Sequence, residues 1–501
     1  MIARSTFHQT SEVILHMLTG QSIVGRMGRL PHWLLRCVLI LSMASILSSC
    51  HSVKTLPHGT SYQGQPLASS DVAFVADKTW IDEDGQRHVE QAIFNDVFRI
   101  IAEAQKLILL DMFLYTDFQG PVPETTRRVA GELTDALIAK KRSHPNMEIV
   151  VITDPVNELY GSLPSPYFDR LKQVGIRVVV TDLRELRDSN AVYSFFWRIL
   201  AKPFGNAPAS TLPNPIGPGR VSLRSYLELL NFKANHRKVL IADSGDTYLG
   251  FVSSANPHDG SSAHRNAAIR FSGGAVTDLI RSENAVLAFS GHEPIDIEYN
   301  YEHEPSSTTV QVITEGKIKD AILTRLDSAG SEQQIDLMMF YLSDREVIVA
   351  LKQAHQRGAR LRLLLDPNKD AFGREKAGIP NRPVGYELND VGIPVRWCNT
   401  LGEQCHAKML LINSEFGDNV IITGSANFTR RNLMDFNLET DVIVSGRSKD
   451  PVIIDSRRYF DEAWDNAGGR VYSLPIEHYK APPWWQSLLY RFTEASGIST
   501  Y

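Results

Sequence analysis

Two short patterns of the same residue types occur 170 positions apart in the chain, NHRKVLIAD and CHAKMLLIN. Each places a histidine two residues before a lysine, and each is followed by a second apolar run that ends in Ser-Ala-Asn. The first copy contains His236, Lys238, Asp243, Ser254 and Asn256, and the second contains His406, Lys408, Asn413, Ser425 and Asn427. A lone histidine-lysine pair is more often a surface feature than a site, but two matching copies indicate duplicated chemistry.

These residue types suit the cleavage or transfer of an anionic ester such as a phosphodiester. That reaction needs a nucleophile, an acid for the leaving oxygen and donors that offset charge on the phosphoryl oxygens. Two histidines can supply the nucleophile and the acid, and lysine, serine and asparagine side chains can hold the phosphate. The apolar runs 239–242 and 409–412 are typical of buried strands. Residues two apart on a strand share a face, so each histidine is predicted to lie beside its lysine.

The two patterns resemble the HxKxxxxD signature of the phospholipase D superfamily. Over roughly residues 75–480 the chain is similar to the bacterial cardiolipin-synthase-like branch. The resemblance implies a covalent phosphohistidine on His236, with His406 protonating the leaving alkoxide. It also implies that the phosphate is held by Lys238, Lys408, Ser254, Ser425, Asn256 and Asn427. It implies no metal and no other cofactor, and the acceptor would be water for hydrolysis or an alcohol for transfer.

The chain departs from this family pattern at two places. Asn413 stands where the signature has aspartate, a position that is mainly structural in the family, so little loss of activity is expected. The family also orients each histidine with a carboxylate. Glu439 fits this role for the second half, but the matching position of the first half is Asn266. An amide can orient an imidazole but cannot stabilise an imidazolium as a carboxylate does. The histidine partnered by Glu439 is therefore the alternative nucleophile.

The duplication extends beyond these patterns. MFLYTD at 112–117 matches MFYLSD at 339–344, VVITDPVN at 150–157 matches RLLLDPNK at 362–369, and LKQVGIRVVV at 171–180 matches LNDVGIPVRW at 388–397. Apolar runs alternate with helical stretches such as 98–106 and 346–357, which predicts an α/β fold with a mixed sheet in each half. The resemblance implies that halves 75–300 and 301–480 pack about a pseudo-twofold axis, with the active site at their interface.

The first half contains one large insertion. Val178 precedes His236 by 58 positions, whereas Val395 precedes His406 by 11, which places the extra residues at about 183–231. The insertion holds the aromatic stretch YSFFWRIL and then a stretch rich in Pro, Gly, Ala and Ser. It is predicted to be a lid or a membrane contact, or alternatively a helix packed on the domain surface. The aromatic segment 481–501 carries one apolar helical stripe, which is typical of core packing and, less often, of an interfacial contact.

The amino terminus is predicted to direct the chain to a bacterial envelope. Residues 1–49 read as a lipoprotein signal peptide: arginines precede a short apolar stretch that ends in Leu-Ser-Ser-Cys50, which resembles a lipobox. The resemblance implies lipidation of Cys50, a linker over 50–74 and, because position 51 is not aspartate, the periplasmic side of the outer membrane. The alternatives are a plain signal peptide or an uncleaved anchor. Met27 is an alternative start of the chain.

The net charge and the cysteines of the chain narrow its possible partners and ligands. The chain has a formal net charge of −5, and removal of residues 1–49 makes it more negative, so the charge argues against nucleic acid as a partner. Of the four cysteines, Cys398 and Cys405 flank the entry to the second pattern. In an oxidising envelope they are predicted to form a disulfide, with two unpaired thiols as the alternative. No further cluster of metal-ligand residues accompanies them.

Together these observations predict an envelope enzyme that hydrolyses or transfers glycerophospholipids. Its partners would be a phospholipid substrate, an alcohol acceptor and the membrane that holds the lipid anchor. A nuclease of the same superfamily is one alternative and would need a basic groove. A degenerate, non-catalytic phospholipid-binding module is the other, because Asn413 and Asn266 replace carboxylates.

Overall fold

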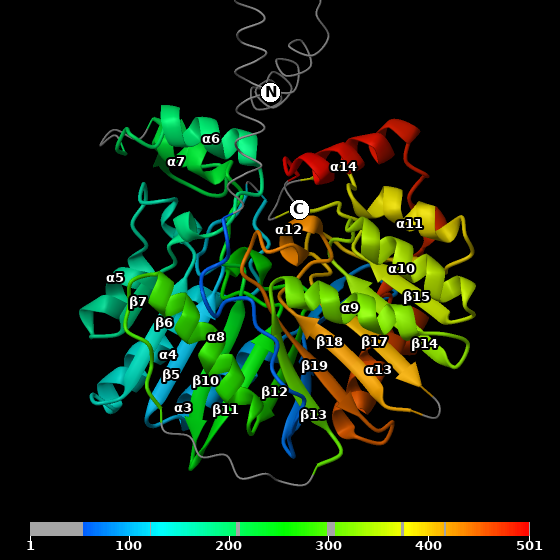
Figure 1. Ribbon diagram of the computed structural model, residues 1–501, viewed down its shortest axis with the longest axis horizontal. Coiled ribbons are helices and arrows are strands. Elements are labelled where there is room, and N and C mark those ends of the chain that lie inside the picture. Colours follow the sequence, from blue (N-terminus) through cyan, green and yellow to red (C-terminus); the bar gives the residue numbers. More distant parts are fainter. Residues whose placement is uncertain are drawn as a thin grey trace, which may run out of the picture. The chain divides into compact units, whose positions relative to one another are not determined.

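The computed structural model describes residues 54–120, 122–206, 211–297, 306–371, 375–414 and 417–499. Two mixed β-sheets lie beside each other within this part of the chain (Figure 1). The first has seven strands in the order β2 (Val72–Ala76), β12 (Ala267–Ser272), β11 (Thr247–Ser253), β10 (Lys238–Ser244), β5 (Leu107–Met112), β6 (Glu148–Thr153) and β7 (Arg177–Val180). The pairs β5–β6 and β6–β7 are parallel, and the other four pairs are antiparallel.

The second sheet repeats this plan within nine strands. Their order is β1 (Leu67–Ala68), β13 (Thr309–Thr314), β19 (Thr440–Gly446), β18 (Asn419–Gly424), β17 (Lys408–Ser414), β14 (Gln333–Met339), β15 (Arg360–Leu365), β16 (Val395–Cys398) and β20 (Ser473–Pro475). The seven strands from β13 to β16 have the order and directions of the first sheet, with parallel pairs only at β14–β15 and β15–β16. The predicted α/β class and the duplication of mixed sheets are confirmed.

Alternation along the strands builds four layers. On β10, Val239 and Ile241 pack in a core shared with the second sheet, whereas Leu240 and Ala242 pack toward helices. The apolar faces of α3 (Ile93–Glu103), α4 (Val129–Ser143) and α5 (Pro166–Gln173) cover the outer face of the first sheet. Those of α9 (Gly316–Ser328), α10 (Arg345–Gln356) and α11 (Asn381–Asn389) cover the second. Helices therefore lie outside and the two sheets pack together, because both faces of each strand are apolar.

The halves exchange elements at their junction. Helix α8 (Ala275–Phe289) follows the first sheet but contacts β13 of the second, and α13 (Pro451–Asp465) follows the second sheet but contacts β2 of the first. The segment 50–74, predicted to be a linker, contributes structure where it is described. Leu67 pairs with Val310 in the second sheet, and β2 of the first sheet already begins at Val72. This segment crosses between the sheets, so the expected boundary at residue 75 is too late.

The insertion of the first half forms α6 (Ala191–Leu200), the short pair β8 (Leu212–Pro213) and β9 (Arg220–Val221), and α7 (Leu223–Leu229). Helix α6 rests on the domain through Ser194 and Trp197, while its opposite face is exposed. The carboxy-terminal helix α14 (Trp484–Ser496) buries Tyr490 and Glu494 and exposes its apolar stripe. Packing of that stripe into the core is therefore wrong. None of the helices within the described ranges is long and apolar enough to cross a bilayer.

Candidate active site at the interface of the halves

Backbone pairing across the interface places the two histidines. The amide of His236 donates to the carbonyl of Leu438 at 2.9 Å, and the amide of His406 donates to the carbonyl of Arg265 at 2.8 Å. Each histidine therefore lies beside a segment of the other half. Strand β10 begins at Lys238 and β17 at Lys408, so both histidines precede their strands. They are held by the same cross-half pairing, which is the local origin of the site's twofold symmetry.

This crossing decides which residue orients which histidine. Nδ1 of His236 donates to Oε2 of Glu439 at 3.0 Å, and Nδ1 of His406 donates to Oδ1 of Asn266 at 3.1 Å. The expectation that Glu439 serves the histidine of its own half is wrong. Its partner is His236, because Glu439 follows the Leu438 that pairs with His236. With Nδ1 donating, Nε2 of each ring carries the lone pair.

The two serines expected to hold the phosphate have another role. Ser254 Oγ donates to Oδ1 of Asn266 at 3.1 Å, and Ser425 Oγ donates to Oε2 of Glu439. Both hydroxyls are fully buried, and neither serine lines the cavity described below. The serines therefore fix the groups that orient the histidines. Asn432 also donates to Glu439, and Asp77 accepts from Asn266 at 3.3 Å.

Each lysine lies beneath its histidine against an aromatic ring. Nζ of Lys238 is 5.0 Å from the centre of the Phe113 ring, and Nζ of Lys408 is 5.3 Å from that of Phe340. Both amines donate to the backbone carbonyl of their own histidine, Lys408 at 2.8 Å. The lysines are buried and are not among the residues that line the cavity, so their contact with phosphate stays a prediction.

The same two phenylalanines contact the histidines. The ring centres of Phe113 and His236 are 4.7 Å apart, and those of Phe340 and His406 are 4.9 Å apart. Burial lowers the pKa of both histidines well below its usual value, and the charges of the lysines lower it further. Both imidazoles are therefore mainly neutral at pH 7, which is the form that a nucleophile requires.

Asp243 and Asn413, expected among the catalytic residues, lie at the far ends of their strands and outside the cavity. The Asp243 carboxylate accepts the backbone N–H groups of Gln105, Lys106 and Leu107, the last two at 2.8 Å, and so holds the turn that enters β5. Asn413 instead donates to Asp336 at 3.2 Å. Both positions are structural, and only the first anchors a turn.

Two aspartates position the residues that precede the histidines. Asp154 accepts the amide of Asn235, and Asp366 accepts the amide of Cys405, each at 2.7 Å. Burial raises the pKa of Asp154 to about 7 and that of Asp366 to about 6. Cys405 is joined to Cys398 by a disulfide with a Cα–Cα distance of 6.1 Å. The segment entering the second histidine is therefore held by a carboxylate and by a covalent link.

A buried ion cluster ties the halves together next to the first histidine. The guanidinium of Arg237 is fully buried between Glu283 of the first half, at 3.1 Å, and Glu315 of the second half, at 2.7 Å. Glu315 also accepts the amide of Glu439 at 3.2 Å. A charge of this kind is stable in the interior only when it is paired. The cluster therefore fixes the strand that carries Glu439 relative to His236.

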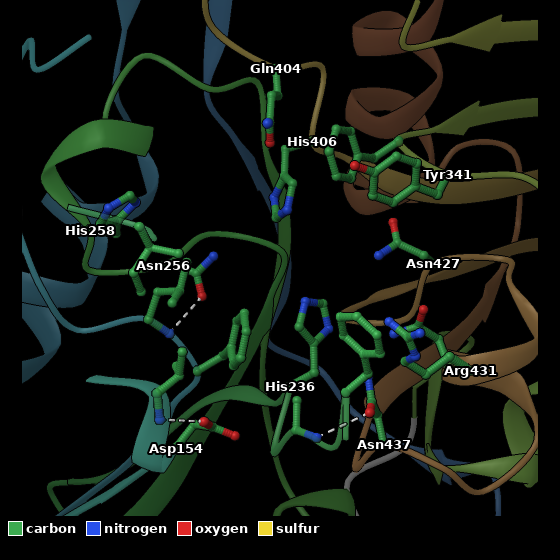
Figure 2. A pocket seen from close by; sticks show the side chains of 18 of the residues that line it. Asp154, His236, Asn256, His258, Tyr341, Gln404, His406, Asn427, Arg431 and Asn437 are labelled. Carbon is green, nitrogen blue, oxygen red and sulfur yellow. Dashed lines mark hydrogen bonds between the residues drawn. The ribbon is translucent and has the colours of Figure 1, made fainter. Parts of the chain in front are cut away.

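The two histidines line one cavity of about 310 Å³ between the halves. Figure 2 shows their rings facing each other, with Asn256 and Asn427 on opposite sides of them. Of the predicted site residues, His236, His406, Asn256 and Asn427 line this cavity. Its charged lining is mostly basic, with Lys233, Lys376 and Arg431 against Asp154. The four histidines of the lining, His236, His258, His264 and His406, are neutral at pH 7, because burial lowers the pKa of each. Such a lining favours an anionic group.

Apolar side chains form much of the remaining wall of the cavity, and several of them are residues that sequence reasoning missed. Ile216 and Leu229 come from the insertion, and Phe232 follows it directly. Phe113 and Phe340 occupy matching positions of the repeated MF pair, which was a usable signal. Arg431, Lys376 and His264 had no such signal, since each enters from a loop or short helix of the interface. No cluster of three or more metal-ligand side chains occurs in the described ranges.

Comparison with known proteins identifies similar chains. Residues 322–464 match the family described as "Cardiolipin synthase, PLD-like domain". No curated protein matches the chain in sequence. Phosphatidylserine synthase of Haemophilus influenzae Rd KW20 has a similar structure, with a TM-score of 0.51 and 10% identity over 90% of this chain and 98% of that one. At that identity the likeness concerns the fold.

Two other solved structures are similar at lower scores. Polyphosphate kinase from Porphyromonas gingivalis has a TM-score of 0.43 and 13% identity over 86% of this chain and 56% of its own. A phospholipase D family member, Nuc, from Salmonella typhimurium has a TM-score of 0.26 and 22% identity over 32% of this chain and 95% of its own.

Proposed function

The chain belongs to the phospholipase D superfamily, with residues 322–464 matching its cardiolipin synthase domain, and on that premise we propose that it transfers or hydrolyses phosphatidyl groups through a covalent phosphohistidine. One observation carries the proposal. Two histidines from different halves line a single cavity, and each is held through Nδ1, which leaves Nε2 for chemistry. In-line displacement needs an attacking and a leaving atom on opposite sides of one phosphorus.

The unequal partners of the histidines support an order of roles. A nucleophilic imidazole becomes positively charged when Nε2 bonds to phosphorus, and a carboxylate stabilises that charge. Only His236 has such a partner, in Glu439. His236 attacks phosphorus and the P–O bond to the alcohol breaks, while His406, which for this step carries a proton on Nε2 as well as on Nδ1, gives its Nε2 proton to the departing oxygen. The anionic phosphodiester bound beside it favours that charged form of His406. In the second step His406 takes a proton from water or an alcohol, whose oxygen displaces Nε2 of His236.

The cavity lining supports a phospholipid as the substrate. A phosphodiester would lie beside the basic residues, and the apolar wall of Ile216, Leu229 and Phe232 would accept an acyl or glycerol portion. Two of these three residues come from the insertion, which has no counterpart in the second half. A nucleic acid would gain little from Ile216 and Leu229, because aliphatic side chains offer a base no ring on which to stack.

Turnover of labelled phosphatidylglycerol, with and without added glycerol, tests the function. We expect phosphatidic acid in water, and products that change when glycerol competes as the acceptor. His236→Ala and His406→Ala should each remove turnover, and Asp117→Ala is a matched control because Asp117 does not line this cavity. Cleavage of single-stranded DNA without lipid turnover would identify a nuclease. Binding of phosphatidylglycerol vesicles without turnover of any phosphodiester would identify a non-catalytic module.

We further propose that the chain is anchored to the periplasmic side of the outer membrane by a lipid on Cys50. Residues 1–53 lie outside the described part of the structure, so the support is the sequence pattern around Cys50. Metabolic labelling with palmitate should tag the wild-type chain and not Cys50→Ser. Equal labelling of the two would contradict the proposal.

A further inference from the structure

Two segments that are far apart in sequence expose apolar side chains at one end of the described body. All five Phe and Trp side chains that are largely exposed in the described residues belong to them: Phe196 and Phe204 in the insertion, and Trp484, Trp485 and Phe492 in α14. Trp484 is 75% exposed and Phe204 is 69% exposed. Helices α6, α7 and α14 lie along the upper edge of the view in Figure 1. Soluble surfaces seldom carry large contiguous apolar patches without a partner.

The exposed residues form helical stripes, so they act as faces and not as scattered positions. On α6 the stripe runs through Val192, Phe196, Ile199 and Leu200. On α14 it runs through Trp484, Trp485, Leu488, Leu489 and Phe492. The spacing of three to four residues keeps each set on one side of its helix. Trp197 on α6 and Tyr490 on α14 point the other way and anchor the helices to the body.

Both segments reach the catalytic cavity. The insertion supplies Ile216 and Leu229 to its wall. The tail of α14 is held by Arg431, which lines the cavity and donates to the carbonyl of Ser499. At its end, Gly497 approaches the carbonyl of Ser189, at the start of the insertion, so closely that no side chain would fit. The two segments therefore meet at Ser189 and Gly497, and both reach the wall of the cavity.

The charges of the insertion complement an anionic surface. Residues 183–231 contain six Arg and Lys and three Asp and Glu, in a chain whose net charge is −5. Beneath α6 a small cavity is lined by Arg184, Arg198, Lys202 and Lys233 together with Asp188 and Glu228. Trp197 also lines it, and its buried Nε1–H has no partner among the described residues. Arg198 and Lys233 already pair with Asp188, so a phosphate headgroup below the apolar stripe would meet Lys202 and Trp197 and would compete with Asp188 for the other two cations.

We propose that α6, α7 and α14 form a docking surface that seats the mouth of the catalytic cavity on a bilayer containing anionic phospholipids. Aromatic and aliphatic side chains would enter the acyl boundary, and the cations beneath α6 would meet the headgroups. The purpose of this surface rests on the proposed function, because docking would bring the cavity to its phospholipid substrate. Docking itself does not depend on catalysis.

Tryptophan fluorescence of the full chain tests the docking. With phosphatidylglycerol/phosphatidylethanolamine vesicles that carry brominated acyl chains, we expect quenching that is lost for the most part in Trp484→Phe/Trp485→Phe. Quenching should weaken with vesicles of phosphatidylcholine alone. Equal quenching of the wild type and this variant would overturn the proposal, because another segment would then hold the bilayer. Protection of Trp484 and Trp485 from acrylamide without vesicles would also overturn it, since a second copy or the amino-terminal segment would then cover the face.

A matched set of variants tests what the surface does. Phe196→Glu/Leu200→Glu should lower turnover of phosphatidylglycerol in vesicles by about tenfold or more, since each buried apolar side chain contributes about that factor. Turnover of short-chain, monomeric phosphatidylglycerol should not change. Val349→Glu/Ile454→Glu, at exposed apolar positions of α10 and α13, is the control. Equal losses on both substrates would overturn the docking role. If the wild type turns over neither lipid, the proposed function fails, while quenching still decides the docking.

Discussion

The two halves share one scaffold but give their histidines different partners. Strand order, the cross-half pairing of each histidine and the phenylalanine beside each ring are the same in both. The orienting residue differs, since Glu439 serves His236 and Asn266 serves His406. The shared features place two Nε2 atoms in one cavity. The difference assigns them separate roles, because only one imidazole has a carboxylate to stabilise a positive charge.

A second contrast lies at the far ends of β10 and β17. Asp243 binds three backbone N–H groups of the turn before β5, but Asn413 binds only a side chain, that of Asp336. Gln333, near the equivalent turn, accepts the amide of Gly330 at 2.8 Å. The second half has thus replaced the aspartate's task by a local bond. Loss of the signature aspartate there is a structural substitution, at a position outside the cavity.

The histidine substitutions should have the largest effect. His236→Ala should lower turnover of any phosphodiester roughly 10⁴-fold or more, because no nucleophile remains. His406→Ala should spare the first step with an aryl phosphodiester, whose leaving group needs no proton. A phosphorylated His236 should then accumulate and be visible by mass spectrometry. If a phosphorylated histidine instead accumulates in His236→Ala and not in His406→Ala, the roles of the two histidines are reversed.

Substitutions of the two orienting residues, Glu439 and Asn266, should lower kcat by different amounts. Glu439→Gln keeps the shape but removes the charge, so kcat should fall by roughly 10²–10⁴. Asn266→Ala should lower kcat about tenfold, since only the orientation of His406 is lost. Asn266→Asp should not raise activity, because Asp77 Oδ2 lies 3.3 Å from the amide nitrogen and two carboxylates would meet. Equal losses in Glu439→Gln and Asn266→Ala, measured as kcat on one substrate, would remove the asymmetry.

The pH dependence should follow the same carboxylate. Burial raises the pKa of Glu439 to about 7. The ionised form, which stabilises the phosphohistidine, is therefore present above that pH and is lost as pH falls through it. With an aryl phosphodiester, kcat/KM should rise through about pH 7 in the wild type. Glu439→Gln should show no such rise. A rise in Glu439→Gln with the same midpoint would assign it to another group.

Substitutions at Asp243 and Asn413, near the ends of β10 and β17, should change the stability of the protein by different amounts. Asp243→Ala should lower the free energy of unfolding by about 2–3 kcal/mol, because three N–H groups, of which that of Leu107 is buried, lose a charged acceptor. Asn413→Ala should cost about 1 kcal/mol or less. Asn413→Asp should destabilise the protein and not activate it, since its carboxylate would face Asp336. Urea unfolding curves measure all three, and a large gain of activity in Asn413→Asp would mean that the second copy is degenerate.

Local patterns in the sequence predicted the fold well. Runs such as 239–242 alternate between the sheet core and the helix core, and repeated strings such as the MF pair mark equivalent strands. The placement of His236 and His406 in one cavity agrees with what the family resemblance implied. The pairing of Glu439 with His236 did not, because it depends on a crossing of segments 203 positions apart. Sequence proximity favoured the histidine of the same half.

Burial explains the other differences between prediction and structure. Ser254 and Ser425 have the right types for binding phosphate, but their hydroxyls are used by Asn266 and Glu439. No sequence pattern distinguishes a serine that faces substrate from one that faces the residue behind a histidine. The stripe on α14 has the spacing of a core helix, and its exposure depends on whether another layer covers it. Such a layer would come from tertiary packing, which the stripe does not encode.

The smallest effect is expected where the halves differ by a covalent link. The disulfide between Cys398 and Cys405 closes a short loop before His406, and the first half has no equivalent. A chain-entropy estimate for such a loop gives roughly 2–3 kcal/mol of stabilisation. The hydrogen bond from the amide of Cys405 to Asp366 does not require the disulfide. Because that bond and the pairing of His406 with Arg265 remain after reduction, activity should fall only a few-fold. Reductant should lower the Tm of the wild type and leave that of Cys398→Ser/Cys405→Ser unchanged. Alkylation and mass spectrometry of both cysteines in full-length protein purified without reductant check the premise: two free thiols would remove the link, and the segments that enter the two histidines would then differ in sequence but not in covalent restraint.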